Sequence, residues 1–313
     1  MLLSRVANYL FWIGRYLERA EYSSRFIHTH YESSLDAPFK DNRRVMLNPI
    51  IEMFGIGLNS GDFKSEENIL NKAMLNMDNT ASVSFSFSKV RQNALNARNV
   101  LSTELWEVIN RYYHYLENFE VKTNESGQLF SFMKTFSEHA ALIRSLINST
   151  LLHDETWATI RVGIYLERAI QINKVLISTI GEIPRGKSQK DNQLTYYMLQ
   201  TLLKSIEAED IYKKLYPGIP NPLLVVYFII NNNIFPRSIN YNINKASELV
   251  NRLFGVNNLS LLREQPFVFD INKLASEVNY LTMQDLENKS MEFLEKNIQK
   301  IENITLTLER DYL

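Results

Sequence analysis

Two glutamates in a repeated motif are the residues whose types and spacing best suit chemistry. The motif reads Gly-Arg-Tyr-Leu-Glu-Arg-Ala from Gly14 to Ala20 and returns as Gly-Ile-Tyr-Leu-Glu-Arg-Ala from Gly163 to Ala169. A buried carboxylate with a shifted pKa is a candidate acid or base. The planar fork of arginine suits a carboxylate or a phosphate. The motif therefore indicates acid–base chemistry or anion binding.

Both copies of the motif lie in helical sequence with apolar residues on opposite faces. Phe11 and Tyr22 flank Glu18 on the helix row that should face solvent, and Ile164 precedes Glu167 on the equivalent row. A helix that is apolar on both sides is buried on both sides. We therefore expect both glutamates to be largely buried. Each should face a cation or a hydrogen-bond donor, because an unpaired buried carboxylate is strongly unfavourable.

Further arginines share helix faces with the glutamates or lie on neighbouring helices. The candidate ligand- or partner-binding residues are Arg15, Glu18, Arg19, Arg25, Arg91, Arg98, Arg161, Glu167, Arg168 and Arg237. In a structural interpretation, the two motif helices pack across a pseudo-twofold axis and their glutamates pair with arginines. In a functional interpretation, some of these groups line a polar cleft for an anionic or amino-acid-like ligand. A solvated face or a partner-protein surface is a third possibility.

The motif offset of 163 − 14 = 149 residues is close to half of the 313-residue chain. It predicts an all-α bundle of long helices, built from two sequence-related halves at 1–152 and 153–313, which together form one compact unit. With 10 glycines and 8 prolines, long stretches have no helix breaker. We expect helices at 2–35, 43–58, 65–78, 81–119 with a break at 102–104, 128–152, 153–180, 192–207, 222–231, 236–254, and 270–312 with a break at 282–283.

Composition argues against several classes of function. The 34 basic and 35 acidic residues leave no broad basic surface for nucleic acid. No cysteine is present, which excludes disulfides, thiolate metal sites and a cysteine nucleophile. The absence of disulfides fits a reducing compartment, so we expect a cytoplasmic protein. No apolar window is long enough for a membrane span, and the N-terminus does not read as a signal peptide.

Motif spacing predicts neither a metal nor a cofactor. None of the five histidines follows a glutamate by three residues, the spacing that a dimetal helical bundle requires. The chain has no His-Glu-x-x-His, no Walker loop, no Gly-x-Gly-x-x-Gly and no Gly-x-Ser-x-Gly. What remains is the constellation of arginines and glutamates.

Several blocks of the chain resemble the bacterial alpha-E domain family. Residues 1–7 and 14–21 resemble the opening of the family's sequence. Later blocks are 91–94 with Arg98 and 101–107, then 154–157 leading into 166–169, and finally 235–239. They occur in the family's order over nearly the whole chain. The resemblance implies an all-helical protein named for its glutamates, with no established catalytic activity. Ile164 stands where the first copy has Arg15, so the arginines of the two copies are not symmetric.

Members of that family are typically encoded beside, or fused to, ATP-grasp-type ligases and transglutaminase-like peptidases. The resemblance therefore implies an accessory component of a peptide or amide ligase system, which holds a peptide or amino-acid substrate or docks the ligase. One alternative is an amide-acting hydrolase or transferase with Glu18 or Glu167 as general base. Another is a helical scaffold that assembles through the last helix.

Overall fold

The computed structural model describes residues 3–37, 42–57, 66–119, 126–184, 188–255, 265–287 and 289–313. Every regular element in these ranges is a helix, which confirms the all-α prediction. The predicted helix ends at residues 2, 58 and 65 lie outside the described residues. In the first half, the helices are α1 (Ser4–Leu35), α2 (Asn42–Met53), α3 (Glu66–Met74), α4 (Val83–Asn96), the 3-10 turn η2 (Arg98–Val100), α5 (Thr103–Glu117) and α6 (Ser126–Thr150).

The second half begins with a long helix equivalent to α1. Its elements are α7 (Glu155–Ile180), α8 (Gln189–Ser205), α9 (Glu209–Leu215), α10 (Pro222–Asn231), α11 (Ile239–Leu253), α13 (Pro266–Asn279), α14 (Met283–Leu286) and α15 (Ser290–Tyr312). The short helix α9 was not predicted. None of the described helices combines the length and the apolar character that crossing a membrane requires.

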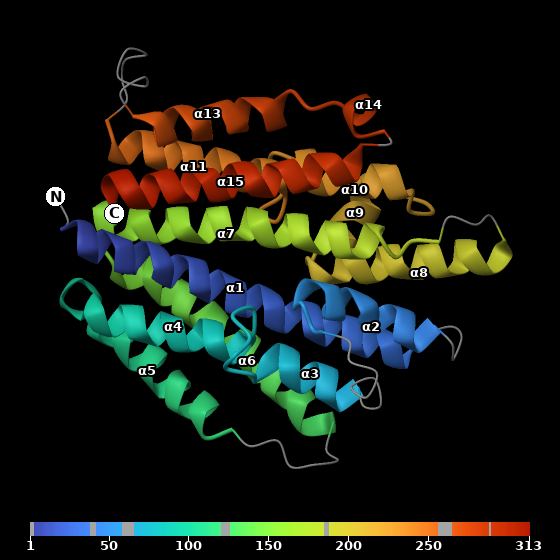
Figure 1. Ribbon diagram of the computed structural model, residues 1–313, viewed down its shortest axis with the longest axis horizontal. Helices are drawn as coiled ribbons and strands as arrows, with labels where there is room; N and C mark the ends of the chain where they lie inside the picture. Colours follow the sequence, from blue (N-terminus) through green and yellow to red (C-terminus); the bar gives the residue numbers. More distant parts are fainter. Residues whose placement is uncertain are drawn as a thin grey trace.

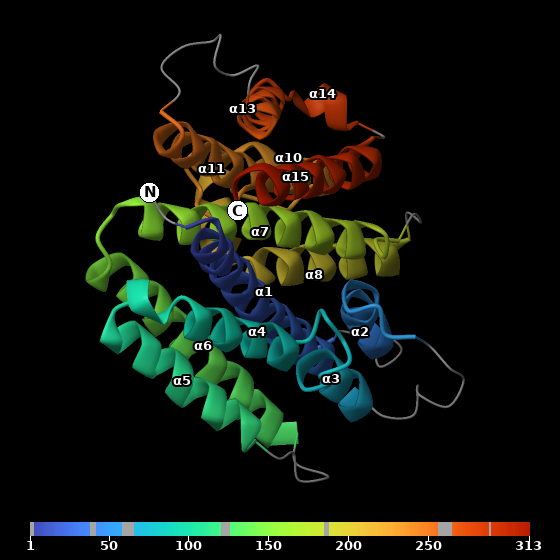
Figure 2. The same cartoon turned by 60° about the vertical axis from the view of Figure 1, so that its left-hand side comes forward.

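The two motif helices, α1 and α7, lie side by side through the middle of the molecule (Figures 1 and 2). On one side, α4 and α6 pack on α1, and α5 covers them. On the other side, α11 and α15 pack on α7, and α13 covers them (Figure 1). Both central helices are therefore enclosed on more than one face, as the apolar residues flanking the glutamates predicted.

Side-chain caps set several helix boundaries. The break predicted at 102–104 is confirmed, because the Ser102 hydroxyl accepts from the Leu105 amide at 3.2 Å and starts α5. Asp154 starts α7 in the same way, accepting from the Thr156 amide at 2.8 Å. Such caps satisfy amide groups that the first helical turn leaves without partners.

Several predicted boundaries were wrong by three residues or more. The helix expected at 65–78 ends at Met74, the one expected from 192 begins at Gln189, and the one expected from 270 begins at Pro266. The helix expected from Pro236 begins at Ile239, because Ser238 caps it by accepting from the Tyr241 amide at 3.0 Å. The helix expected at 43–58 ends at Met53, followed by Gly55 in the left-handed region at φ 57°. The helix expected at 270–312 is three helices. Its break at 282–283 is confirmed by the Thr282 cap of α14, but a second break precedes α15.

Candidate functional site

Glycine is required where α1 and α7 come together. A Cβ at Gly14 would meet the carbonyl oxygen of Ile160, and a Cβ at Gly163 would meet the carbonyl oxygen of Phe11. Each motif thus begins at a backbone-to-backbone contact with the other helix. The motif glutamates follow four residues later, one helical turn along. This close approach carries Glu18 and Glu167 into the interface between the two helices.

Glu167 is fully buried and receives hydrogen bonds from three side chains. Arg19 donates through both Nε, at 2.7 Å, and a terminal nitrogen, at 3.1 Å. Arg15 Nε also donates to this carboxylate, and Gln171 donates at 2.6 Å. Arg15 in turn donates to the Thr305 hydroxyl of α15 at 3.0 Å. Burial raises the pKa of Glu167, but the charges of Arg15 and Arg19 and these hydrogen bonds outweigh burial and hold the pKa well below its usual range.

Glu18 is 1% exposed and is held by one arginine fork. Arg168 donates through Nε at 2.6 Å and through a terminal nitrogen at 2.8 Å, so the pair is bidentate. Burial raises the pKa of Glu18, but the charge and hydrogen bonds of Arg168, followed by the charges of Arg144 and Arg237, lower it below its usual range. The predicted burial and pairing of both motif glutamates are therefore confirmed.

The two motifs exchange partners. The glutamate of the first copy, Glu18, binds Arg168 of the second copy, and the glutamate of the second copy, Glu167, binds Arg19 of the first. The glutamate of each Glu-Arg dipeptide thus pairs with the arginine of the other dipeptide, and its arginine pairs with the other glutamate. The arrangement is an interhelical clamp made of two reciprocal ion pairs, formed directly beside the glycine contacts.

More charged residues extend the clamp on the Glu18 side. Glu21, also on α1, pairs with Arg25 at 2.7 Å and with Arg144 of α6. Arg237, in the turn before α11, approaches Glu21 at 3.9 Å and pairs with Glu207 at 2.5 Å. Arg25 also lies 3.4 Å from Glu207, which follows α8. We call this set the arginine cluster; its members are Arg25, Arg144, Arg168 and Arg237 with Glu18, Glu21 and Glu207.

Comparison with protein families gives one match that covers the chain. The model of a family called Alpha-E, described as a predicted alpha-helical domain with a conserved ER motif, matches residues 2–313. The chain belongs to the Alpha-E family. Both copies of the repeat carry Glu-Arg, at 18–19 and at 167–168. Searches of curated proteins and of solved structures gave no match.

In this Alpha-E chain, the reciprocal clamp supplies a physical reason for the Glu-Arg dipeptide. The dipeptide places a carboxylate and a guanidinium on adjacent positions of one helix, and each pairs with the opposite charge on the other helix. A further Glu-Arg pair, at Glu309 and Arg310 on α15, is engaged elsewhere. Glu309 accepts from the Trp12 indole, and Arg310 pairs with Asp311 at 2.6 Å.

Three of the predicted site residues lie outside the clamp and the arginine cluster. Arg91 donates to Asn110 at 3.0 Å, and Arg98 lies over the Trp106 ring at 5.3 Å, so both contact α5. Arg161 donates to the Tyr165 hydroxyl on its own helix. The structure therefore brings seven of the ten predicted residues into the clamp or the cluster.

The asymmetry between the two motif copies is also visible in the structure. Arg15 contributes to the Glu167 pocket, whereas its counterpart Ile164 is fully buried and apolar. On the Glu18 side, Arg144 and Arg237 act through their charge from other helices and loops. The arginines are therefore not symmetric, as the substitution at position 164 indicated.

Sequence reasoning missed three members of the arginine cluster: Glu21, Arg144 and Glu207. Glu21 could have been found, because it lies three residues after Glu18 and thus on the same helix face. Arg144 and Glu207 come from separate helices and loops, and no local pattern marks them. Among the described residues, no three or more His, Cys, Asp or Glu side chains lie close enough to hold a metal ion.

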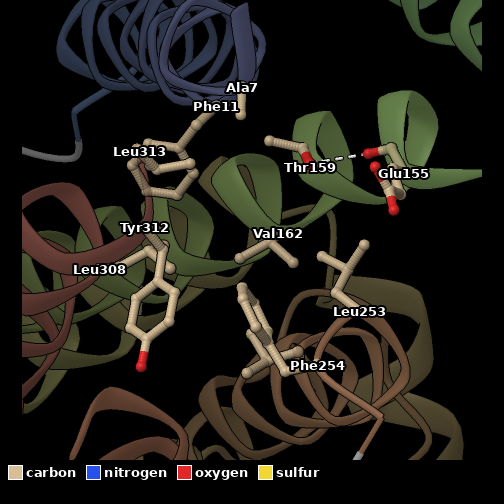
Figure 3. A pocket seen from close by; sticks show the side chains of 11 residues that line it. Ala7, Phe11, Glu155, Thr159, Val162, Leu253, Phe254, Leu308, Tyr312 and Leu313 are labelled. Atoms are coloured by element: carbon tan, nitrogen blue, oxygen red, sulfur yellow. Dashed lines mark hydrogen bonds between the residues drawn. The ribbon is translucent and has the colours of Figure 1, made fainter. Parts of the chain in front are cut away.

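An apolar pocket of about 130 Å³ lies apart from the predicted site residues (Figure 3). It is lined by Ala7, Phe11, Glu155, Thr159, Val162, Val250, Leu253, Phe254, Leu308, Tyr312 and Leu313. The Thr159 hydroxyl donates to the Glu155 carbonyl at 2.7 Å. The pocket is walled mainly by hydrocarbon and contains no arginine, so it does not supply the anion chemistry that the motif indicated.

The geometry argues against the general-base alternative. Glu18 and Glu167 are 1% and 0% exposed, so no substrate reaches them without separating α1 from α7. Their lowered pKa values also make them weak proton acceptors. Both carboxylates act as counter-charges for arginines in this arrangement.

Proposed function

We propose that this Alpha-E protein is a non-catalytic binding component of an ATP-grasp-type peptide or amide ligase system. It would hold a peptide or amino-acid substrate, or dock the ligase or a transglutaminase-like peptidase. The observation that supports this proposal most is the use of both motif glutamates in the interhelical clamp. Because the motif glutamates hold two helices together, they are not available as catalytic groups. The arginines beside the clamp can still bind a ligand or a partner.

The binding chemistry is that of the arginine cluster. Its four guanidinium groups face three carboxylates, and guanidinium forks recognise carboxylates in two-pronged geometry. Peptides and amino acids, the substrates of a peptide or amide ligase, carry a free carboxylate. Because such a ligase consumes ATP, the proposal places the protein in the bacterial cytoplasm.

A scaffold function through the last helix receives less support. α15 packs on α7 and α13 of its own chain. It also forms hydrogen bonds with α1. Thr305 and Glu309 of α15 accept from Arg15 and Trp12 of α1, respectively. Removing the chain from Asp270 onward would uncover α7, so such a truncation tests folding rather than assembly.

Reconstitution with an ATP-grasp-type ligase tests the proposal. A ligase and a transglutaminase-like peptidase, the two partner classes that the family resemblance implies, are purified and combined with the chain, with and without ATP. Co-purification and the amount of ATP-dependent amide product are measured. We expect the ligase to co-purify with the chain and product formation to require the chain. Arg237→Gln should reduce product formation. Arg98→Gln, which removes an exposed arginine outside the cluster, should leave it unchanged.

Two results would contradict this function. One is a ligase that does not bind the chain and forms the same amount of amide product with and without it. The other is amide hydrolysis or transfer by the purified chain alone.

A further inference from the structure

Glu207 differs from the other carboxylates of the arginine cluster. Its side chain is 57% exposed, whereas Glu18 and Glu21 are buried. It lies between α8 and α9 rather than on a helix, and its backbone is in the left-handed region at φ 54°, which is uncommon for a residue with a side chain. From this position its carboxylate pairs with Arg237 at 2.5 Å and lies 3.4 Å from Arg25. Glu207 therefore binds the arginines at the solvent edge of the cluster.

Both arginines that Glu207 contacts have N–H donors that no acceptor among the described residues satisfies. One terminal nitrogen of Arg25, one of Arg237 and the Tyr22 hydroxyl are buried without a hydrogen-bond partner among the described residues. Arg25 is 8% exposed and Tyr22 is fully buried. Buried donors of this kind are rare, and each calls for an explanation.

The charge of the cluster is also unbalanced. Four arginines against three glutamates leave a formal charge of 4 − 3 = +1. Burial and the nearby charges of Arg25 and Arg168 lower the pKa of Arg237 to about 9. The positive charge is therefore concentrated where Glu207 is the exposed counter-charge. A ligand carboxylate, unlike that of Glu207, is not fixed to the backbone between α8 and α9, so it can be positioned to accept from the donors that Glu207 leaves without a partner.

We propose that Arg25 and Arg237, with the Tyr22 hydroxyl, form a receptor for the free carboxylate of a peptide or amino acid, and that Glu207 occupies this receptor until the ligand carboxylate replaces it. This inference rests on the proposed function and names the chemical group that the protein recognises. Glu207 is suited to be displaced, because a partly exposed ion pair adds little stability. The buried donors then supply hydrogen bonds that Glu207 does not accept.

Calorimetric titration of the full chain with glycylglycine tests the receptor. Glu207→Gln removes the competing charge and should bind glycylglycine about tenfold more tightly than the wild-type chain, a difference of about 1.4 kcal/mol. The control is Glu209→Gln, which neutralises a glutamate two residues away that pairs with Lys213 instead. It should bind like the wild type. Adding Arg237→Gln to Glu207→Gln should remove the gain.

Two further probes identify the ligand group. The C-terminal amide of glycylglycine lacks the carboxylate and should bind at least tenfold more weakly. Inorganic phosphate, which is tetrahedral, should also bind more weakly than the planar carboxylate. Equal binding of the amide, or tighter binding of phosphate, would overturn the carboxylate assignment. A folded Glu207→Gln chain that binds glycylglycine no better than the wild type would overturn the displacement itself.

Tyr22→Phe provides a variant that does not disturb charge. It removes a hydroxyl that has no partner among the described residues, so the free protein should be as stable as the wild type or more stable. Binding of glycylglycine should weaken by roughly two- to tenfold if the hydroxyl donates to the ligand. Unchanged binding would remove Tyr22 from the receptor.

The receptor and the proposed function can fail separately. A chain that binds glycylglycine as described, yet leaves the ligase unaffected, would contradict the function and leave the receptor in place. A chain that supports the ligase but binds none of the probes would contradict the receptor alone.

Discussion

At the scale of single residues, Glu167 shows what the motif glutamates do. Its carboxylate accepts from Arg15, Arg19 and Gln171, and it has no exposure to solvent. A buried ion pair adds little compared with a well-packed apolar pair, but breaking one by removing a single partner leaves an uncompensated buried charge. The motif glutamates are therefore necessary for stability because of the arginines that they neutralise.

Glu167→Gln should accordingly destabilise the protein severely. The substitution leaves Arg15 and Arg19 without their shared counter-charge, and we expect the free energy of unfolding to fall by about 3–5 kcal/mol. Urea denaturation followed by circular dichroism measures this change. Glu138→Gln, at an exposed position on α6, is the control and should change stability little. A Glu167→Gln chain as stable as that control would contradict the buried pairing.

The same carboxylates predict how stability depends on pH. The folded-state pKa values of Glu18 and Glu167 lie below the ordinary value of 4.5. A group with a lowered folded pKa adds stability that is fully present above its unfolded pKa and is lost as pH falls through the folded pKa. The free energy of unfolding should therefore decline once pH drops below about 4.5. The Glu167→Gln chain should lose less stability between pH 6 and pH 3 than the wild type, because it lacks one of the two carboxylates. An equal loss in both proteins would contradict this source of acid sensitivity.

Residue-scale prediction from sequence succeeded where helical periodicity was sufficient. The apolar rows around Glu18 and Glu167 predicted burial, and burial of a carboxylate required a cation. Arg19 and Arg168 directly follow the two glutamates in the same motif. Arg144 and Glu207 were not predicted, because nothing local places α6 or the end of α8 beside α1.

At the scale of elements, the packing of α1 on α7 depends on two glycines. Gly14 and Gly163 let each backbone approach the other, with Ile164 N 3.0 Å and Arg15 N 3.2 Å from the positions that the missing Cβ atoms would take. Any side chain there would push the helices apart and lengthen the ion pairs beside them. The glycines and the Glu-Arg dipeptides therefore form one unit in each motif.

Gly14→Ala and Gly163→Ala should each destabilise the protein. The added methyl group meets the backbone of the partner helix, and overpacking of this kind costs about 1–3 kcal/mol or more. The matched control is Gly127→Ala on α6, where no atom lies within 4 Å of the new Cβ. There the substitution should stabilise by up to about 1 kcal/mol through helix propensity. Thermal unfolding of the three variants measures both signs. Equal effects at all three positions would contradict the close approach of α1 and α7.

The element boundaries were predictable where capping residues and breakers were strong. Ser102, Asp154 and Thr282 start helices near the expected positions. At the start of α11, proline suggested the first turn, yet the nearby Ser238 supplied the cap. These two valid start signals, Pro236 and Ser238, lie two residues apart, and the hydrogen bond from the Tyr241 amide to Ser238 decided between them.

At the scale of the whole molecule, α1 and α7 join the two halves of the chain. Each half contributes one central helix. Helices α4, α5 and α6 lie on the side of α1, and α11, α13 and α15 lie on the side of α7 (Figure 2), while α2 and α8 contact both central helices. The repeat predicted two related halves, and their pseudo-twofold relation remains a prediction. The position of the arginine cluster depends on segments from both halves, which the sequence repeat did not indicate.

Separate halves should not fold independently. Residues 1–152 alone would expose the face of α1 that carries Glu18, and residues 153–313 alone would expose the face of α7 that carries Glu167. We expect each piece by itself to show reduced helix content and no cooperative unfolding, and helix content to rise when the pieces are mixed. Circular dichroism and size-exclusion chromatography measure this. Two pieces that each unfold cooperatively, with full helix content, would show that the halves are autonomous domains.

The reciprocal clamp between the two Glu-Arg dipeptides is tested most directly by a double-mutant cycle on Glu18 and Arg168. The free energy of unfolding is measured for the wild type, Glu18→Gln, Arg168→Gln and the double variant. Because the pair is buried and bidentate, we expect a coupling energy of about 2 kcal/mol or more, with the double variant much less destabilised than the sum of the single variants. Single effects that add to within about 0.5 kcal/mol would show that the two residues do not hold α1 and α7 together.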